Sequence, residues 1–515
     1  MEPEPVLSRD ARTGETRARI GVEADAAAVD AAVRAADATR DAFADRPRRA
    51  ALLRAAAETV EARADVLIAA ADAETALGVP RLTGELARVA YQFRFFAGIV
   101  EDGGYLGVVI DPPDPAAVPP RPELRRWKVP IGTVAVFAAS NFPFAFSVPG
   151  GDTASALAAG CPVVVKAHPD HPETSELAAA AIRDAAVQAG LPADVLTLVH
   201  GRQAGVDLVR HPLISAVGFT GSIPGGRALF DLAAARPAPI PFYGELGSLN
   251  PVLITERTAA ARGTETAAGL VASYTLGQGQ FCTKPGLVLV PAGPAGDALV
   301  ATAAEAASAA VPGALLDARM REHFLAGFAA RAALPGVRTL VEAAAAPADG
   351  VPQAVRAGLL EVDAEALDGA TLDGANLDGA NLVGSRQGVG AGAGELLEEC
   401  FGPVTVLVRY RDMAVVEAVL GRLGGNLTAT LHAEPDEPDA ARWVSRLARF
   451  AGRVIFGGWP TGVAVAPAMT HGGPYPATTT PTTSVGGTAI ERWLRPVTFQ
   501  TVPPELLQPE LSQPS

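Results

Sequence analysis

The chain of 515 residues is too long for one hydrophobic core, so two or three domains are expected. With 49% hydrophobic and 19% charged residues its composition is typical of a globular protein, and its net charge of −14 argues against a surface for nucleic acid or anionic lipid. The N-terminal residues lack the basic and apolar regions of a secretory signal, and no long uncharged apolar stretch is present, so we expect a cytoplasmic protein with no membrane partner.

Residues 24–99 carry apolar side chains at helical spacing, and the arginines between them are expected to be solvated. Residues 107–129 are rich in proline and are predicted to be extended. From 133 to 246, short Val-rich strands alternate with helices, which predicts a parallel doubly wound sheet with buried strands.

Polar residues fall at or just after the predicted ends of these strands. Ligands of such sheets bind beyond the carboxyl ends of the strands, so the coincidence predicts a site at that edge. The residues are Asn141, Lys166, Arg202, Ser222 and Glu245.

A second α/β region is predicted after residue 247, with an Ala-rich helix near 296–311. Within it, leucines recur every five residues in 367–384, in an Ala-Asn-Leu-Asp-Gly pattern. Such repeats can wind a β-helix, but these make only about one coil, and a single coil cannot bury its own face. The repeats are therefore predicted to be a surface insertion.

The cysteines are Cys161, Cys282 and Cys400, which are far apart and match no metal-ligand spacing, so we expect no metal and no disulfide framework. Cys161 has the apolar neighbours of a core residue. Cys282 instead lies in an uncharged turn, Gly277-Gln-Gly-Gln-Phe-Cys-Thr283, whose backbone amides can approach a ligand. Only a few per cent of a free thiol is thiolate at pH 7, so reactivity here needs a base or donors for the developing charge.

Five motifs together resemble the aldehyde dehydrogenase superfamily, and they occur in the order found there. They are Ala-Ser-Asn141-Phe-Pro, Phe219-Thr-Gly-Ser222, Glu245-Leu-Gly, Phe281-Cys282 and Glu399-Cys-Phe401-Gly-Pro. Further segments are similar to the NADP-preferring 2,5-dioxovalerate (α-ketoglutaric semialdehyde) dehydrogenases: Ala139–Ser147, Lys166-Ala-His-Pro, Gly226–Phe230, Pro241–Ser248, Gly458–Gly462 and Met469–Ala477.

This resemblance implies an α/β fold with two doubly wound parallel-sheet domains and a small β oligomerisation element. The cofactor-binding domain would comprise 1–110 and 131–246 with part of 440–475, and the catalytic domain 247–440. Residues 111–130 and 478–500 would form the oligomerisation element. Members of the family occur as homodimers and homotetramers, so we expect one of these assemblies.

The resemblance also implies catalytic roles. Cys282 would add to an aldehyde, and the Asn141 amide with the Cys282 backbone N–H would stabilise the alkoxide. Glu245 would activate the water that opens the resulting thioester, and its use at neutral pH would need partial burial to raise its pKa. Taken alone, each residue has a plainer interpretation: a loop cysteine, a turn asparagine before Phe-Pro and a surface glutamate.

At the cofactor end, Gly221, Ser222 and Gly226 occupy a strand-to-helix turn whose N–H groups can hold a pyrophosphate, although no Gly-x-Gly-x-x-Gly fingerprint is present. The resemblance implies that Glu399 and Phe401 lie at the nicotinamide ribose.

Lys166 would reach the adenosine ribose, with His168 nearby. Many NAD-preferring relatives have Glu where this chain has Pro169, and Arg202 resembles the arginine that pairs with a 2′-phosphate. A dianion facing Lys and Arg is favourable. NADP is therefore expected, with NAD as the alternative.

The substrate expected from the resemblance is 2,5-dioxopentanoate, oxidised to 2-oxoglutarate, and Arg94 is a candidate partner for its carboxylate. Succinic semialdehyde or an aliphatic aldehyde is the alternative. A cofactor-independent thiol hydrolase or esterase is a further alternative, weakened because no histidine adjoins the Cys282 motif. His171, His211 and His471 are expected in loops or on the surface.

Overall fold

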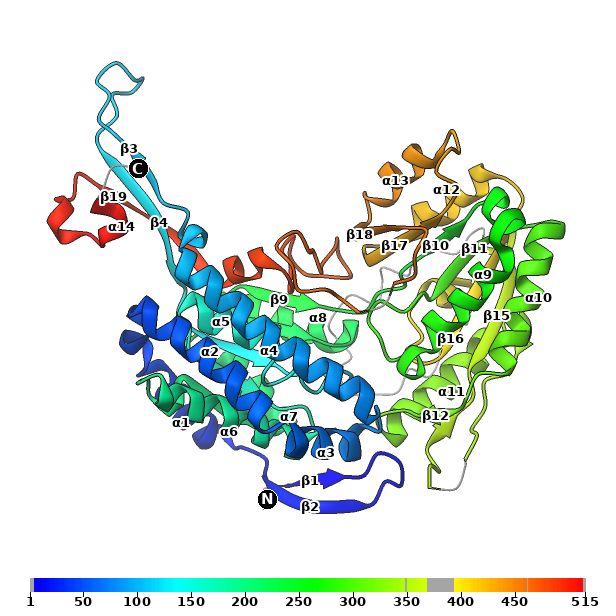
Figure 1. The fold of residues 1–515 in the computed structure, drawn as a ribbon, viewed down its shortest axis with the longest axis horizontal. Helices are drawn as coiled ribbons and strands as arrows, with labels where there is room; N and C mark the ends of the chain where they lie inside the picture. The colour runs from blue at the N-terminus through cyan, green and yellow to red at the C-terminus, as the bar shows by residue number, and fades with distance from the viewer. Residues whose placement is uncertain (1–3, 348–349, 368–392, 461, 513–515) are drawn as a thin grey trace.

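The computed structural model describes residues 4–347, 350–367, 393–460 and 462–512. It confirms the predicted fold class, an α/β protein with parallel sheets (Figure 1). The pentapeptide pattern at 367–384 lies, apart from Leu367, outside the described residues.

The first sheet has five parallel strands in the order β7-β6-β5-β8-β9. The register places Val136 of β5 opposite Val165 of β6 and Gly218 of β8. All five side chains of β5 are buried, because helices cover both faces of the sheet. The strands are β5 (Thr133–Phe137), β6 (Val163–Lys166), β7 (Leu196–Val199), β8 (Ile214–Thr220) and β9 (Phe242–Glu245).

Alternate residues of these strands enter two different cores, as the two-residue period of a strand requires. Val134 and Val136 pack with one group of helices, whereas Ala135 and Phe137 pack with the other. The first group is α2 (Arg46–Ala62), α3 (Ala64–Thr75), α4 (Val79–Asp102), α5 (Gly151–Ala159) and α6 (Pro172–Gln188); the second is α1 (Ala26–Asp37), α7 (Arg202–Arg210) and α8 (Ile223–Ala234).

The second sheet has seven strands in the order β13-β15-β16-β11-β10-β17-β18, parallel except for β13. Leu287 and Leu289 of β11 face one core, and Val288 and Val290 the other. The strands are β10 (Val252–Ile254), β11 (Leu287–Pro291), β13 (Arg338–Val341), β15 (Gly358–Asp363), β16 (Val404–Tyr410), β17 (Asn426–His432) and β18 (Ala451–Phe456). The helices are α9 (Glu256–Thr275), α10 (Pro294–Ser308), α11 (Ala318–Ala332), α12 (Met413–Arg422) and α13 (Ala440–Leu447).

A three-stranded antiparallel arm extends away from the first sheet (Figure 1). The proline-rich segment supplies β3 (Val109–Asp111) and β4 (Leu124–Pro130), and β4 pairs along its whole length with β19 (Leu494–Gln500). The short helix α14 (Pro509–Ser512) lies against β4. Smaller sheets pair β1 (Pro5–Arg9) with β2 (Thr16–Val22), and β12 (Gly313–Ala314) with β14 (Ala354–Val355).

Residues 440–475 divide between the two sheets. The helix α13 packs on the second sheet and β18 pairs with β17 at its edge, whereas Val463 and Val465 pack against Phe95 of α4, beside the first sheet. One local expectation differs from the structure. The arginines of α4 were expected to be solvated, yet Arg81 and Arg88 are largely buried because the helix packs its polar face against the 141–147 loop.

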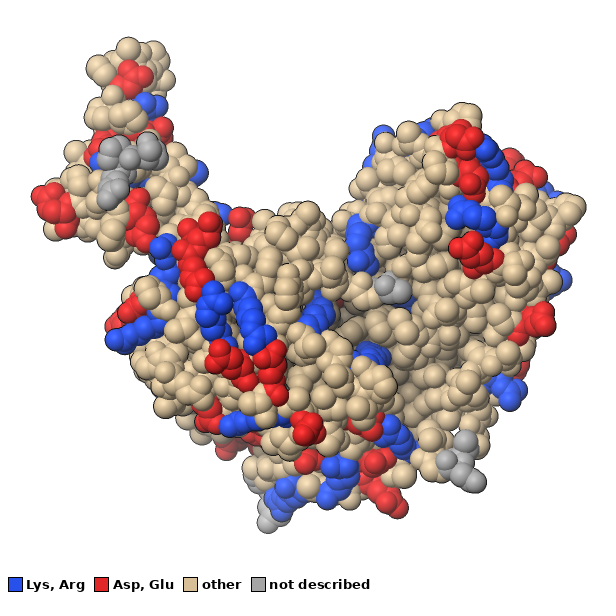
Figure 2. All heavy atoms as spheres, in the orientation of Figure 1, with Lys and Arg blue, Asp and Glu red and all other residues tan. Residues whose placement is uncertain are grey.

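On the face drawn in Figure 2 the surface is hollowed between the two lobes. Basic and acidic side chains are interspersed there, so this face has no continuous basic field for a polyanion. Among the helices of the described residues, none combines the length and apolarity needed to cross a bilayer.

Candidate active site

Cys282 follows a short 3-10 turn, η4 (Leu276–Gly279), in which Gly277 and Gly279 have φ of 55° and 66°. A Cβ on Gly279 would lie 2.2 Å from the carbonyl oxygen of Gly402, so only glycine fits there. The side-chain amide of Asn250 donates to the Cys282 carbonyl oxygen at 2.8 Å. These constraints fix the backbone that carries the thiol.

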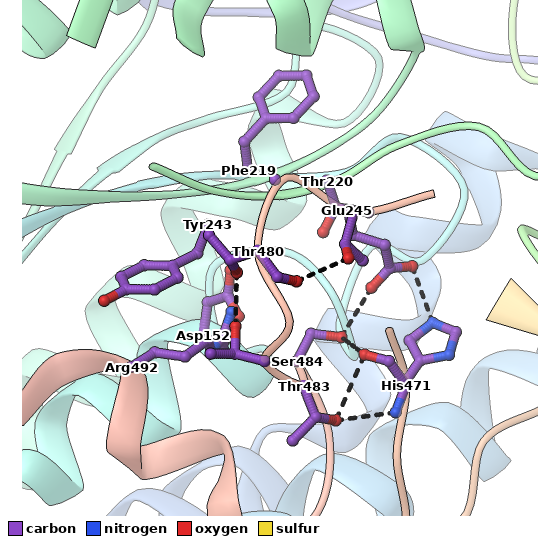
Figure 3. A pocket seen from close by; sticks show the side chains of 13 residues that line it. Asp152, Phe219, Thr220, Tyr243, Glu245, His471, Thr480, Thr483, Ser484 and Arg492 are labelled. Atoms are coloured by element: carbon purple, nitrogen blue, oxygen red, sulfur yellow. Dashed lines mark hydrogen bonds and ion pairs between the residues drawn. The ribbon is translucent and has the colours of Figure 1, made fainter. Parts of the chain in front are cut away.

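Glu245 is the last residue of β9, and its carboxylate is 3% exposed. One oxygen, Oε1, lies 2.8 Å from His471 Nε2, and the other accepts a hydrogen bond of 2.7 Å from Ser484 (Figure 3). His471 Nε2 is also 3.5 Å from the Cys282 Sγ. A thiol, an imidazole and a carboxylate therefore meet in one buried cluster.

The environment shifts two of these groups in opposite directions. Burial raises the pKa of Cys282 well above its usual range, and the charge of Glu245 raises it further. Burial also acts to raise the pKa of Glu245, but the charge and hydrogen bond of His471, together with the Ser484 hydroxyl, outweigh it and lower that pKa. The net shift of the Glu245 pKa is therefore downward, although partial burial was expected to have to raise it. The thiol is kept protonated beside an ionised base.

His471 is the residue that the sequence analysis missed. It lies in a loop, as expected, but it is 1% exposed and so is not at the surface; His171 and His211 are likewise buried residues outside helices and strands. His171 contacts the Ala139 carbonyl oxygen, and His211 contacts Asp30. The segment Met469–Ala477 had been singled out, but its histidine comes 189 residues after Cys282, and no local pattern predicts their contact.

One atom each from Cys282, Glu245 and His471 lies within 4.8 Å of the other two, and such groups are also zinc ligands. Here Glu245 already pairs with His471 and Ser484, and a cavity opens at the thiol. This arrangement favours acid–base activation of a nucleophile over metal binding.

Asn141 lies in the loop after β5, in contact with the turn that carries Cys282, and is 8% exposed. Its Nδ2 donates to the carbonyl oxygen of Gln280 at 2.9 Å, and its own carbonyl accepts from Arg81 at 2.6 Å. Because an amide nitrogen carries two hydrogens, a second donor is left for a ligand.

A cavity of about 250 Å³ opens at the thiol. It is smaller than pockets for drug-sized ligands, about 300–1,000 Å³, so it suits a small substrate. Its described lining is Arg88, Phe142, Phe146, Phe281, Cys282, Thr283, Gly462, Val463 and Ala464. A second, polar cavity of about 10 Å³ lies behind Glu245, between β9 and the 478–484 segment, and is large enough for one water (Figure 3).

Lys166 and Arg202 lie at neighbouring strand ends, β6 and β7, as predicted. Burial lowers the pKa of Lys166 to about 8, and the nearby Arg202 charge contributes to the lowering. Burial holds the pKa of His168 well below its usual range, and the positive charge on His171 or Lys166 lowers it further. His168 is therefore neutral. The pKa of Asp170 is raised to about 7, by burial and by the neighbouring Asp317.

Gly221 and Ser222 lie between β8 and α8, as predicted. Ser222 is the N-cap of α8 and accepts from the Gly225 N–H at 3.3 Å. A Cβ on Gly226 would lie 2.1 Å from Leu246 Cδ2, so the glycine lets the first turn of α8 approach the chain beyond β9. The exposed first turn of α8 leaves backbone N–H groups for an anion.

Glu399 lies close to Gly247, two residues after Glu245. A Cβ added to Gly247 would be only 2.5 Å from the Glu399 Oε2. Burial raises the pKa of Glu399 to about 7, against the opposing charge of Lys284. Phe401, two residues later, is half-buried. Arg94 is not at the cavity: both of its terminal nitrogens bind Glu61 on the surface, so the expectation that it meets the substrate is wrong.

The model of the family described as the aldehyde dehydrogenase family matches residues 3–346. The chain belongs to the aldehyde dehydrogenase family. An α-ketoglutaric semialdehyde dehydrogenase 2 of Azospirillum brasilense is 47% identical over 493 residues, covering 93% of this chain and 88% of that protein. An α-ketoglutaric semialdehyde dehydrogenase of Acinetobacter baylyi (strain ATCC 33305 / BD413 / ADP1) is 42% identical over 437 residues, covering 84% and 78%.

Solved aldehyde dehydrogenase-like structures share the fold. A 3,6-anhydro-L-galactose dehydrogenase in complex with NAP has a TM-score of 0.78 at 21% identity, covering 97% of this chain and 96% of that one. PnpE in complex with nicotinamide adenine dinucleotide has the same score and identity, covering 96% and 93%. The family match and the two relatives at 47% and 42% identity show that the chain is an enzyme that oxidises aldehydes.

Proposed function

We propose that this aldehyde dehydrogenase oxidises 2,5-dioxopentanoate to 2-oxoglutarate with NADP, through a covalent intermediate on Cys282. The observation that carries the proposal is the buried cluster of Cys282, His471 and Glu245 at the end of a small cavity, with Asn141 beside it. Nucleophile, base and oxyanion donor are the three parts that acyl chemistry at a thiol needs.

Cys282 passes its proton to the His471–Glu245 pair as Sγ bonds to the aldehyde carbon, whose oxygen becomes an alkoxide. The free Asn141 N–H and the Cys282 backbone N–H stabilise that charge. When bound, the nicotinamide dinucleotide supplies the acceptor for the aldehyde hydrogen and its electron pair. After the pair has released the thiol proton to solvent, Glu245 takes a proton from water, and the resulting hydroxide displaces Sγ from the thioester. The proton held by Glu245 then returns to Sγ as the acid leaves.

The described residues fit such a cofactor. The close approach at Gly226 and the first turn of α8 form a place for the pyrophosphate. We assign Gly221, Ser222 and Gly226 to it, Lys166, His168 and Arg202 to the adenosine end, and Glu399 and Phe401 to the nicotinamide ribose.

NADP is favoured over NAD because Lys166 and Arg202 lie together, and because Asp170 is partly protonated at neutral pH. Lys166 and Arg202 can then attract the negative 2′-phosphate, because a protonated Asp170 adds no negative charge to repel it. The NAP found with one structural relative is NADP, and another relative holds NAD, so both dinucleotides suit the fold.

The substrate follows from the two relatives, both named α-ketoglutaric semialdehyde dehydrogenases, and from the small cavity.

We further propose three units: a cofactor domain of 1–110 and 131–246, a catalytic domain of 247–440 extended by α13 and β18, and an oligomerisation arm of 111–130 and 478–500. The arm's open β-edges would form a homodimer or homotetramer. A cytoplasmic location fits the free thiols of Cys161, Cys282 and Cys400.

The test is to supply 2,5-dioxopentanoate with NADP or NAD and to follow absorbance of the reduced cofactor. We expect turnover with NADP at a higher kcat/KM than with NAD, and also higher than with succinic semialdehyde or pentanal. Cys282→Ala should lose turnover and still bind NADP. Turnover that survives in Cys282→Ala would overturn the mechanism, and a preference for pentanal would overturn the substrate.

The contact between His471 and Cys282 also favours a second candidate, cofactor-independent hydrolysis of activated esters, because the histidine that such an enzyme needs is present. Hydrolysis of p-nitrophenyl acetate without NADP measures it. If ester hydrolysis exceeded aldehyde oxidation in kcat/KM, the hydrolase would be the better description.

A further inference from the structure

Helix α4 presents a row of polar side chains to the active-site loop. Arg81, Glu85, Arg88 and Gln92 follow each other at helical spacing, so they share one face. Glu85 Oε1 accepts the backbone N–H groups of Phe144 and Ala145, at 2.9 and 2.8 Å. This face therefore holds the loop that carries Asn141.

Arg81 has a structural role in this arrangement. Its Nη2 donates to the Asn141 carbonyl oxygen at 2.6 Å, and its guanidinium lies over the rings of Phe142 and Phe281, at 4.9 and 4.6 Å from their centroids. It is not among the residues that line the cavity at the thiol.

Arg88 differs because it does line that cavity, together with Cys282. Its Nε donates to the Val463 carbonyl at 3.1 Å, its Nη1 donates to Gln92 at 3.3 Å, and its guanidinium lies 5.3 Å from the centroid of the Phe146 ring. Its Nη2 is buried and has no hydrogen-bond partner among the described residues.

A buried guanidinium nitrogen without an acceptor is costly, and such a group in a native structure calls for a partner. Among the described lining residues, Arg88 is the one cation, and the rest are apolar, aromatic or thiol and hydroxyl side chains. A ligand that brings an anionic oxygen to Nη2 would satisfy the donor. The aromatic walls would take up the apolar carbons between that oxygen and the thiol.

We propose that Arg88 binds the carboxylate of the substrate and thereby selects short aldehydes that carry an acid at their far end. This rests on the proposed function, since it takes 2,5-dioxopentanoate as the substrate. With its carboxylate on Nη2, the five-carbon chain extends across the cavity and presents its aldehyde to Cys282. Arg88 contacts the substrate without taking part in bond making.

Arg453 in β18 is the competing cation. Its Nε and Nη2 are also buried without a partner among the described residues, and its charge acts on Cys282. It does not belong to the described lining of the cavity, whereas Arg88 does. Arg88 is therefore the better placed of the two for a ligand.

The experiment compares Arg88→Met, Arg88→Lys and Arg94→Met in the full-length enzyme, each with 2,5-dioxopentanoate and with pentanal, at saturating NADP. Pentanal has the same number of carbons and no charge. Arg94→Met is the matched control, because it removes an arginine from the same helix but away from the cavity.

For Arg88→Met we expect kcat/KM for the keto acid aldehyde to fall about 10- to 100-fold, mainly through KM, as loss of a charged hydrogen bond does. The kcat/KM of Arg88→Met for pentanal should change less than threefold. With the keto acid aldehyde, the kcat/KM of Arg88→Lys should lie between those of wild type and Arg88→Met, and that of Arg94→Met should match wild type.

An equal loss for both substrates in Arg88→Met, or no loss for either, would overturn the inference. If Arg88→Met does not fold, Arg88→Lys decides, because a lysine keeps the charge but not the planar donors. A wild-type enzyme that prefers pentanal would instead refute the proposed substrate, and that result is known before any variant is measured.

Discussion

The two ends of the active site are built differently. At the thiol, Cys282, Glu245, His471 and Ser484 come from segments up to 239 residues apart, and both carboxylate oxygens of Glu245 have partners inside the protein. At the cofactor end, the assigned adenosine and pyrophosphate residues come from the strand ends of one sheet between 166 and 226.

The exposure of the two ends differs too. Glu245 and His471 are 3% and 1% exposed, whereas Arg202, Gly221 and Ser222 are exposed to solvent. A buried cluster of hydrogen-bonded groups holds the reacting atoms at defined distances and shifts their pKa values, which chemistry requires. An open edge with helix N–H groups and cations can receive a large, charged ligand from water.

The largest effect is expected at Asn141. Asn141→Ala should lower kcat by about 10²- to 10³-fold, because one donor to the alkoxide is lost. Steady-state rates with 2,5-dioxopentanoate measure the loss, and fluorescence titration with NADP should give an unchanged Kd. A parallel loss of NADP affinity would contradict the separation between the two ends.

His471→Gln should lower kcat by about 10²-fold, since the thiol loses a neighbour that takes part in proton transfer. It should also shift the pH profile. His471 helps to lower the pKa of Glu245, so without it burial dominates and that pKa rises. Because Glu245 acts as a base in its ionised form, the acidic limb of kcat/KM should move to higher pH. An unmoved limb would mean that His471 only packs.

Gly226→Ala tests the cofactor end. The new Cβ would lie 2.1 Å from Leu246 Cδ2 and 2.9 Å from Phe219, so the chain must shift. We expect destabilisation of about 1–3 kcal/mol and a higher Kd for NADP. Gly421→Ala in α12 is the control, since a Cβ added there would have no neighbouring atom within 4 Å, and its thermal midpoint should not fall. If both variants had the same thermal midpoint and the same Kd for NADP, the close approach of Gly226 to Leu246 would be contradicted.

The smallest effect is expected from Asp170. Its pKa of about 7 means that it ionises as pH rises through neutrality, which adds negative charge beside Lys166. The KM for NADP should therefore rise by about fivefold between pH 6 and 8, and the KM for NAD should rise less. Asp170→Asn should flatten the difference between the cofactors. If the KM for NADP still rose more steeply with pH than the KM for NAD in Asp170→Asn, a group other than Asp170 would be responsible.

The cofactor end was largely predictable from the sequence, because strand ends in a doubly wound sheet are local features. Lys166 ends β6, Arg202 follows β7 by three residues, and Ser222 follows β8 by two, each as expected from the Val-rich runs. The order of the parallel strands then brings these ends to one edge without further information.

The thiol end was only partly predictable. The glycines around Cys282 indicated a special turn, but the contact of His471 depends on a long C-terminal segment that has no regular structure to predict it. Arg88 was missed in favour of Arg94 because both lie on α4. The spacing from Arg81 through Glu85 to Gln92 could have distinguished them, since it places Arg88 on the buried polar face.

The central claim is that acyl transfer takes place on Cys282 with Glu245 as the base for the water. The most direct measurement is intact-protein mass spectrometry of Glu245→Gln after incubation with 2,5-dioxopentanoate and NADP. We predict an acyl adduct that persists and maps to Cys282, since the thioester forms but water is not activated. No adduct in Glu245→Gln, or an adduct that remains when Cys282→Ala is added, would contradict the account.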